Sequence, residues 1–259
     1  MLRPTDPTQL APELVYDHHL HGGPPLWTSN VDYSGPVPLD VHIHEGREVA
    51  VLLEGEYDMS FDSYHLAAKP GDLWLVGMWE PHAHGTRPAL VRTVKIAVVI
   101  LLPEFLGDER LGSVPWLSLF SVPPEERPRA TTPEMREMTL AAGRELWRET
   151  AEKRPGWQTM VRLDLLRLLL GVSREWDPPN LPHADTRSLA RIMPALSLGH
   201  SVPPRLVSVT DAAAACGYSR SRFDSIFLRA TGLTFGRFLL RSRLAYVAQQ
   251  LLRTDLSIA

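Results

Sequence analysis

Short runs of apolar residues, punctuated by turn-forming residues, fill the sequence from about residue 25 to residue 102. Apolar runs at 49–53, 57–61 and 73–76 are each bounded by Gly, Pro, Asp or Ser, which favour turns. Several strands at this spacing are typical of a β-sandwich or a small β-barrel. We therefore predict a β-rich domain over residues 1–102.

The pattern changes to helical spacing after residue 102. Apolar residues recur every three or four positions over 135–149 and over 157–176, which predicts two helices within a helical segment spanning 103–177. Leucines on the second of these helices fit either packing inside the protein or a homodimer surface. These leucines are Leu163, Leu166 and Leu170.

Beyond a proline-rich linker at 178–186, the sequence predicts an all-α domain over 187–259. An alanine-rich helix is expected over 209–216, Gly217 interrupts it, and a second helix begins at Arg220. Two helices joined by a short turn containing glycine form a helix-turn-helix, whose second helix can enter the major groove of DNA.

The second helix of this pair has one apolar face and one polar face. Phe223, Ile226 and Phe227 recur at helical spacing and are predicted to be buried. The polar positions predicted to contact DNA are Arg220, Ser221, Arg222, Asp224, Ser225 and Arg229. Arginine can contact phosphates or guanine, and Ser or Asp can contact base edges. The alternative is an ordinary helical hairpin with a solvated face.

Charge is divided unevenly along the chain. The net charge is −3, but residues 1–182 hold 17 Lys and Arg against 26 Asp and Glu, whereas residues 183–259 hold 10 against 4. A local basic excess favours contact of the C-terminal domain with DNA phosphates. Chance segregation of surface charge is the alternative explanation.

The remaining composition indicates a cytoplasmic protein without a membrane partner. No apolar stretch approaches the roughly 20 residues that a membrane-spanning helix requires. The N-terminus lacks the charged and apolar segments of a secretory signal. Cys216 is the single cysteine and allows no internal disulfide, which fits a reducing compartment.

The sequence over 208–259 resembles, without gaps, the DNA-binding domain of the AraC/XylS family of bacterial regulators. The positions that recur in that family are matched by Ala213, Gly217, Ser219, Phe227, Gly232, Phe238, Arg243, Leu251 and Asp255. The resemblance implies promoter DNA as a partner. It places Ser221, Asp224 and Ser225 in base-facing positions, with Arg220, Arg222 and Arg229 near the DNA backbone.

Two departures from the family pattern bear on DNA binding. Ser225 stands where an arginine is common, which weakens base recognition by this helix. The family normally has a second helix-turn-helix, and this sequence stops at 256–259, where that motif would begin. We expect that the sequence is truncated. One motif per protomer makes few phosphate contacts, so affinity should be weak and strongly salt-dependent unless a dimer supplies another.

Four potential metal ligands occur in the β-rich domain. His42, His44 and Glu48 are separated by even numbers of residues, so on extended strands their side chains can share one face. His82 follows a later apolar strand and offers a fourth ligand. This mixed nitrogen and oxygen set suits divalent Zn, Fe, Mn, Ni or Co. The alternative is a small-molecule pocket without a metal.

The segments around these four residues resemble the two motifs of the cupin superfamily, whose metal-binding members use the matching positions. The N-terminal domain of AraC-type regulators is itself cupin-like, so the resemblance implies a cupin-type β-barrel sensor domain over residues 1–102. His84 is expected to be a spare ligand or to support the others. Three further histidines, His18, His19 and His21, are expected to lie in a surface loop.

The predicted fold class is therefore α+β and multidomain, with a cupin-type β-barrel, a helical segment and an all-α helix-turn-helix domain. The first functional hypothesis is a transcription regulator, not an enzyme, whose barrel binds a metal ion or a small-molecule effector that modulates DNA binding. The second is a metal-dependent cupin enzyme, a dioxygenase or isomerase, with a helical extension. The basic helix-turn-helix favours the first, because an enzyme has no need of it.

Overall fold

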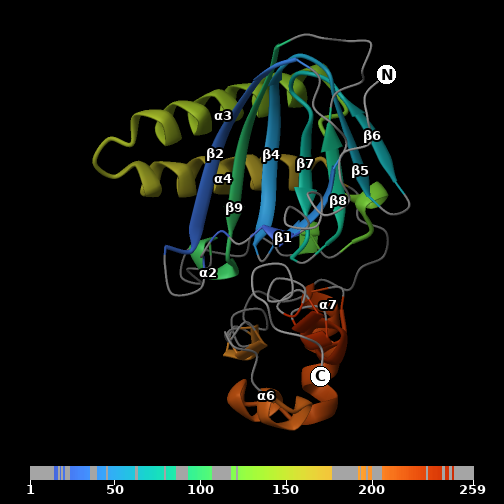
Figure 1. Cartoon of the computed structure of the whole chain (residues 1–259). Coiled ribbons are helices and arrows are strands. Elements are labelled where there is room, and N and C mark those ends of the chain that lie inside the picture. The colour runs from blue at the N-terminus through green and yellow to red at the C-terminus, as the bar shows by residue number, and fades with distance from the viewer. Residues whose placement is uncertain are drawn as a thin grey trace.

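Two β-sheets, a pair of long helices and a group of C-terminal helices make up the computed structural model (Figure 1). The structure describes residues 15–16, 18, 20, 24–35, 40–44, 46–61, 64–78, 80–85, 93–106, 118–120, 122–176, 192, 194–196, 198–199, 206–231, 233–240, 243–244 and 247. The predicted linker at 178–186 lies outside these residues. Every helix in the described part of the chain is too short or too polar to span a bilayer.

The described strands pair into two separate sheets. One sheet has the order β1 (Val15–Tyr16), β3 (Asp40–His44), β8 (His82–Gly85), β5 (Tyr57–Phe61) and β6 (His65–Ala68). The other has the order β2 (Leu26–Ser34), β9 (Thr93–Leu101), β4 (Arg47–Glu54) and β7 (Leu73–Val76). The fold is α+β. Among the described strands none pairs with both sheets, so the expected closed barrel is not what the structure shows.

The two faces of the interior strand β4 are buried in different cores. Val49 and Val51 belong to the core that includes the helices, whereas Ala50 belongs to the core between the sheets. All three are fully buried, as expected for a strand covered on both faces. Because side chains alternate along a strand, Glu48 faces the same way as Ala50, toward the other sheet. The predicted apolar runs lie within β4, β5 and β7.

Helices α3 (Pro133–Glu152) and α4 (Trp157–Arg174) cover the outer face of the sheet that contains β4, as Figure 1 shows. Gly143 allows α3 to approach β4 closely, because a Cβ there would lie 2.7 Å from a side-chain carbon of Leu53. The buried side chains of α4 are Val161, Leu165, Leu168, Leu169 and Val172. Leu163, expected either at a homodimer surface or in internal packing, is 53% exposed on the outer side of α4.

Several shorter helices connect or extend these elements. They are α2 (Pro103–Leu106), η3 (Ser118–Phe120), η4 (Pro124–Glu126), α6 (Val209–Ala215) and α7 (Arg220–Thr231). Helices α6 and α7, with residues 233–240, are called the helical head below. The head lies at one end of the sheets, below them in the view of Figure 1. Its helices follow the two predicted from the sequence, including the interruption at Gly217.

Candidate functional site

Four side chains, called the His–Glu cluster below, meet between the two sheets. They are His42 and His44 on β3, His82 on β8 and Glu48 on β4. All four are between 1% and 6% exposed. His42 and His82 are directly opposite each other on antiparallel strands. One ligand atom from each of His42, Glu48 and His82 lies within 4.8 Å of the others. The sequence-predicted residues are therefore brought together.

The hydrogen bonds of His44 and His82 leave lone pairs directed at Glu48. Nδ1 of His44 lies 3.1 Å from the Gly46 carbonyl oxygen, and Nδ1 of His82 lies 2.9 Å from the Glu80 carbonyl oxygen. A carbonyl only accepts, so each Nδ1 carries the proton and each neutral ring has an unprotonated Nε2. These Nε2 atoms lie 3.2 Å and 3.7 Å from Oε2 of Glu48.

This convergence of acceptor atoms fits a bound cation. Nε2 of His82 is buried and has no hydrogen-bond partner. Metal-bound histidines commonly donate their other N–H to a backbone carbonyl, as both rings do. The alternative, two imidazolium rings with centroids 5.0 Å apart, places two like charges in a buried site. Burial lowers the pKa of His44, which favours its neutral form.

Neighbouring side chains hold the cluster in place. Nε1 of Trp74 donates a hydrogen bond of 2.8 Å to Oε1 of Glu48, which leaves Oε2 for the histidines. This donated hydrogen bond favours the ionised form of Glu48, which is the form that binds a metal ion.

His84 lies beside the cluster and is paired with Tyr57. The Tyr57 hydroxyl lies 2.6 Å from Nδ1 of His84. Burial raises the pKa of Tyr57, so the hydroxyl stays protonated and donates a hydrogen bond to this nitrogen. Burial lowers the pKa of His84, so its ring is neutral. The His84 ring lies 4.6 Å from that of His42, between centroids, so it is a neighbour of the cluster; its expected role as a supporting or spare ligand stays a prediction.

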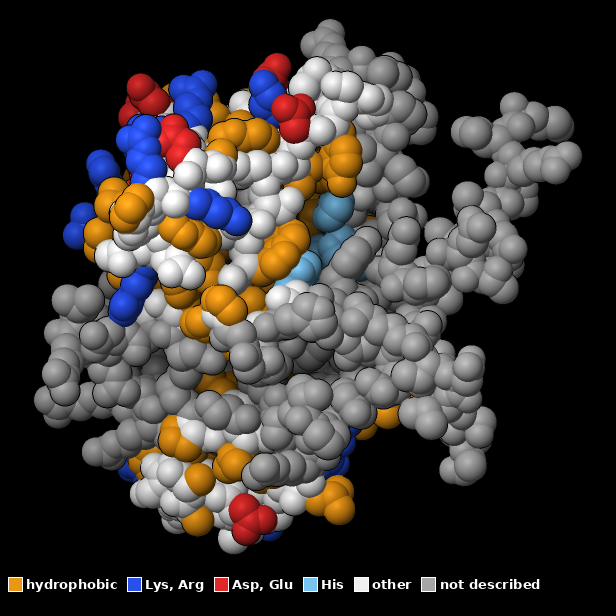
Figure 2. Space-filling model, turned by 60° about the vertical axis from the view of Figure 1, so that its left-hand side comes forward, with side chains coloured by type: hydrophobic (Ala, Val, Ile, Leu, Met, Phe, Trp, Pro, Cys, Tyr) orange, Lys and Arg blue, Asp and Glu red, His pale blue; other side chains and the backbone are white. Residues whose placement is uncertain are grey.

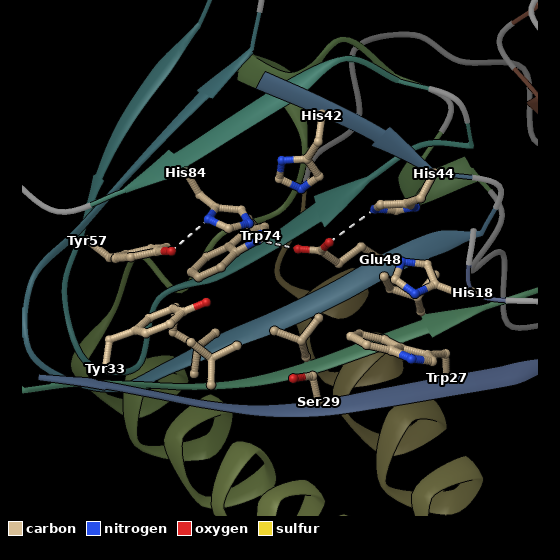
Figure 3. Close-up of a pocket in the computed structure, with 14 residues that line it drawn as sticks. His18, Trp27, Ser29, Tyr33, His42, His44, Glu48, Tyr57, Trp74 and His84 are labelled. Carbon is tan, nitrogen blue, oxygen red and sulfur yellow. Dashed lines mark hydrogen bonds and ion pairs between the residues drawn. The ribbon is translucent and has the colours of Figure 1, made fainter. Parts of the chain in front are cut away.

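A pocket of about 170 Å³ opens onto the cluster (Figure 3). Its lining comes from both sheets: His18, Trp27, Ser29, Val31, Tyr33, His42, His44, Glu48, Tyr57, Trp74, His84, Ile96, Val98 and Ile100. The space-filling view shows histidine side chains in a hollow bordered by hydrophobic ones (Figure 2). The cluster is therefore accessible to a small molecule.

His18 differs from the sequence expectation of a surface loop. Its ring lies 4.1 Å from that of Trp27 and 5.6 Å from that of His44, between centroids, and it lines the pocket. The reason is the parallel pairing of β1 with β3, which aligns Tyr16 with His44. No local pattern in the sequence signals that pairing. His19 and His21 lie outside the described residues.

The helical head is built around aromatic residues. Ring centroids of Phe223, Phe227, Phe235 and Phe238 lie between 5.2 Å and 6.1 Å from their neighbours in this group. Ser208 begins α6 with a capping box, in which its hydroxyl accepts from the Asp211 N–H and the Asp211 carboxylate accepts from the Ser208 N–H. These interactions fix two short helices that have little stability of their own.

The residues predicted to contact DNA lie on the outer face of α7. The exposed ones are Arg220, Ser221, Arg222, Asp224 and Ser225. Phe223, Ile226 and Phe227 are buried beneath them, as predicted. Arg229 is within α7, but its side chain lies outside the described part of the structure. Nε of Arg220 lies 4.0 Å from Oδ2 of Asp224, so this carboxylate partly neutralises the positive charge of the face.

Comparison with known proteins finds similarity only among solved structures. No protein-family model and no curated protein sequence matches the chain. Apo ToxT from Vibrio cholerae is similar with a TM-score of 0.43 and 9% identity over 85% of this chain and 98% of that one. ToxT bound to an unsaturated fatty acid gives 0.38 and 10%, over 85% and 96%. The AraC-like transcriptional activator CuxR gives 0.36 and 12%, over 80% and 68%. At these values nothing about the site is transferred to this chain.

Proposed function

We propose that the chain is an AraC-type transcription regulator whose two-sheet unit binds a divalent transition metal and a small-molecule effector. The observation that carries the proposal is the presence of two sites in one chain. One is a buried cluster of converging histidine and carboxylate acceptor atoms, and the other is a helical pair that presents arginines outward. Promoter DNA is the proposed partner, and the cytoplasm, where that DNA lies, the proposed location.

The metal would be held by His42, His44, Glu48 and His82, in the cupin-type arrangement that the sequence suggests. A set of three neutral imidazoles and one carboxylate suits Zn, Fe, Mn, Ni or Co, and availability in the cell decides among them. The bound ion would contribute positive charge at the inner wall of the pocket.

DNA would be bound by α7, the second helix of the head. The exposed Arg220 and Arg222 are placed to contact phosphates, and Ser221, Asp224 and Ser225 to contact base edges. Arg229 belongs to the same proposed set. A single short helix with few arginines predicts weak binding that falls steeply with salt concentration.

A homodimer would supply a second head, and we place its surface on the outer side of α4. Met160 and Leu163 are 43% and 53% exposed there, three residues apart on one helix face. Light scattering after size-exclusion chromatography, with Leu163→Glu as the variant, tests this part. A wild-type chain that is monomeric at micromolar concentration would refute it.

One experiment tests the central proposal. Metal content is measured by elemental analysis in the wild type, His42→Ala and Glu48→Ala, and DNA affinity is measured by fluorescence anisotropy on a duplex from upstream of the chain's own gene. We expect about one metal per wild-type chain, loss of metal in both variants and a metal-dependent DNA affinity. Equal metal content in all three proteins would remove the site.

A further inference from the structure

The two walls of the pocket differ in chemistry. One wall carries His42 and His44 of the His–Glu cluster, and Glu48 meets them from β4 in the opposite sheet. Beside Glu48, the opposite wall includes β2 and β9, where Val31 is paired with Ile96 and Ser29 with Val98. Trp27 lies at one end of the pocket and Tyr33 at the other, as Figure 3 shows. A molecule that fills the pocket therefore meets polar atoms on one side and aliphatic carbon on the other.

The size of the pocket limits its occupant to about one ring. Its volume of about 170 Å³ is close to the roughly 150 Å³ of an apolar cavity that accommodates benzene. A molecule with one substituted ring or a short chain fits. The exposed Tyr33, 42% accessible, marks the side open to solvent.

The charge of the pocket depends on whether a metal is bound. Glu48 is the one acidic side chain among the described lining residues, and no Lys, Arg or Asp is among them. The metal-free pocket therefore carries one negative charge. A divalent ion at the cluster reverses the net charge to one positive, and bound cations commonly dominate such sites.

We propose that metal occupancy sets the sign of the ligand, so that the metal-loaded pocket takes a small amphipathic monoanion such as a one-ring carboxylate. Its oxygen atoms face the His–Glu cluster, and its apolar part packs on Val31, Ile96 and Val98. This inference rests on the proposed metal site and adds the ligand class. The metal-free pocket instead favours a cation of similar size.

The test uses isothermal titration of the full chain with phenylacetate and phenethylamine, two probes of matched size and opposite charge. Each is titrated at about pH 8 into zinc-loaded and metal-free protein. We expect phenylacetate to bind the zinc-loaded protein about tenfold or more tightly than the metal-free protein, and phenethylamine to show the opposite order.

Val98→Phe places a larger side chain in the aliphatic wall and so fills part of the pocket. Val41→Phe, at a position 56% exposed on β3, is the matched control. The first should lose phenylacetate binding while still taking up zinc, and the second should keep both. Zinc uptake without phenylacetate binding, or equal binding with and without zinc, overturns this inference alone. Failure to take up zinc overturns the proposed function as well.

A second inference comes from a buried ion pair outside the pocket. Arg127, 8% exposed, donates from Nη1 and Nη2 to the two carboxylate oxygens of Glu80, each at 2.7 Å. It also donates to the carbonyl oxygens of Leu75 and Val122, at 2.7 Å and 3.1 Å. Such bidentate geometry is specific to arginine.

This ion pair contacts the cluster and is bonded to Val122, which lies two residues after η3, the segment that contacts the head. The Glu80 carbonyl oxygen accepts from Nδ1 of His82, so the position of Glu80 fixes that ring. On the other side, η3 contacts both β7 and α7. Leu119 and Phe120 of η3 belong to the same core as Phe227 of α7.

We infer that Arg127 and Glu80 are positioning residues that transmit the state of the cluster to α7. The test is the ratio of DNA affinity with and without metal in the wild type and in Arg127→Lys, which keeps the charge but loses the bidentate contact. We expect a ratio of about tenfold in the wild type and a ratio near one in the variant. By linkage, DNA should raise the metal affinity of the wild type by the same factor.

Arg129→Lys is the matched control, because Arg129 lies two residues away and donates to the exposed Glu125 carbonyl oxygen. Glu80→Gln breaks the pair from the other side and guards against a folding defect in a single variant. A ratio in Arg127→Lys and Glu80→Gln equal to that of the wild type overturns the inference. So does a wild type that binds metal and DNA without any dependence of one on the other.

Discussion

The pocket and the helical head place their functional groups on opposite sides of their packing. In the two-sheet unit, charged and polar groups such as Glu48 and His82 lie inside, and each is at most 3% exposed. In the head, aromatic groups such as Phe227 lie inside and the arginines lie outside. The proposed metal site depends on buried polar contacts, whereas the proposed DNA contact depends on the side chains that the head exposes to solvent.

This difference predicts how the two regions respond to substitution. A change inside the sheets alters the site itself, because a buried polar group that loses its partner is costly. A change inside the head alters stability first and DNA binding only as a consequence. Variants that separate these two outcomes therefore test the comparison.

Phe227→Ala is expected to have the largest effect on stability. Phe227 is fully buried, and its ring lies 5.4 Å, 5.2 Å and 5.4 Å from those of Phe223, Phe235 and Phe238. Removing it should cost about 3–5 kcal/mol. Hydrogen exchange should show loss of protection in α6 and α7, while metal affinity stays within the roughly tenfold range of the proposed coupling. A larger loss of metal affinity would mean that the two regions do not fold separately.

Leu228→Ala is the control for that variant. Leu228 is the next residue on α7 and is 45% exposed. Its removal should change the free energy of unfolding by no more than about 0.5 kcal/mol.

Trp74→Phe tests the His–Glu cluster, and its expected effect is the next largest. The substitution keeps an aromatic ring but removes the Nε1–H that donates to Oε1 of Glu48. Loss of such a supporting hydrogen bond should reduce metal affinity by about 10- to 100-fold. Competition with a chelator measures it. Trp176→Phe, which removes the N–H bonded to the Glu126 carbonyl oxygen, is the matched control and should leave metal affinity unchanged.

The sequence predicted those features that depend on local spacing. Even separation placed His42 and His44 on one face of β3, whereas Glu48 meets them from β4 in the other sheet. Spacing of three and four placed Phe223 and Phe227 in the core of the head. The helix boundaries around Gly217 followed from the same local signals.

Features that depend on pairing between distant segments were not predicted. Trp74 reaches Glu48 only because β4 and β7 are neighbours, and His18 reaches the pocket only because β1 pairs with β3. The expected closed barrel appears as two sheets, since strand alternation constrains which face is buried but not which strands pair. Arg127 gave no signal, because its partner Glu80 is 47 residues away.

Matched substitutions of helix-capping residues compare the two regions through smaller changes in the free energy of unfolding. Thr132 caps α3 by accepting from the Met135 N–H, and Ser208 caps α6 by accepting from the Asp211 N–H. Thr132→Ala and Ser208→Ala should each cost about 1 kcal/mol in chemical denaturation. Only Ser208→Ala should reduce protection of the head in hydrogen exchange. Equal loss of protection in α3 and α6 from either variant would indicate a single cooperative unit.

Arg222→Ala is expected to leave stability unchanged and so isolates the outward-facing function of the head. Arg222 is exposed, and its guanidinium lies 5.8 Å from the centre of the Tyr218 ring, a contact of little energy. If Arg222 contacts a phosphate, its removal should lower the slope of log affinity against log salt concentration by about 1, equally on all DNA sequences. Arg154→Ala, at a 75% exposed position between α3 and α4, should not change that slope. If the slope is unchanged in Arg222→Ala, this side chain does not contact a phosphate, and DNA must approach a different face of the head.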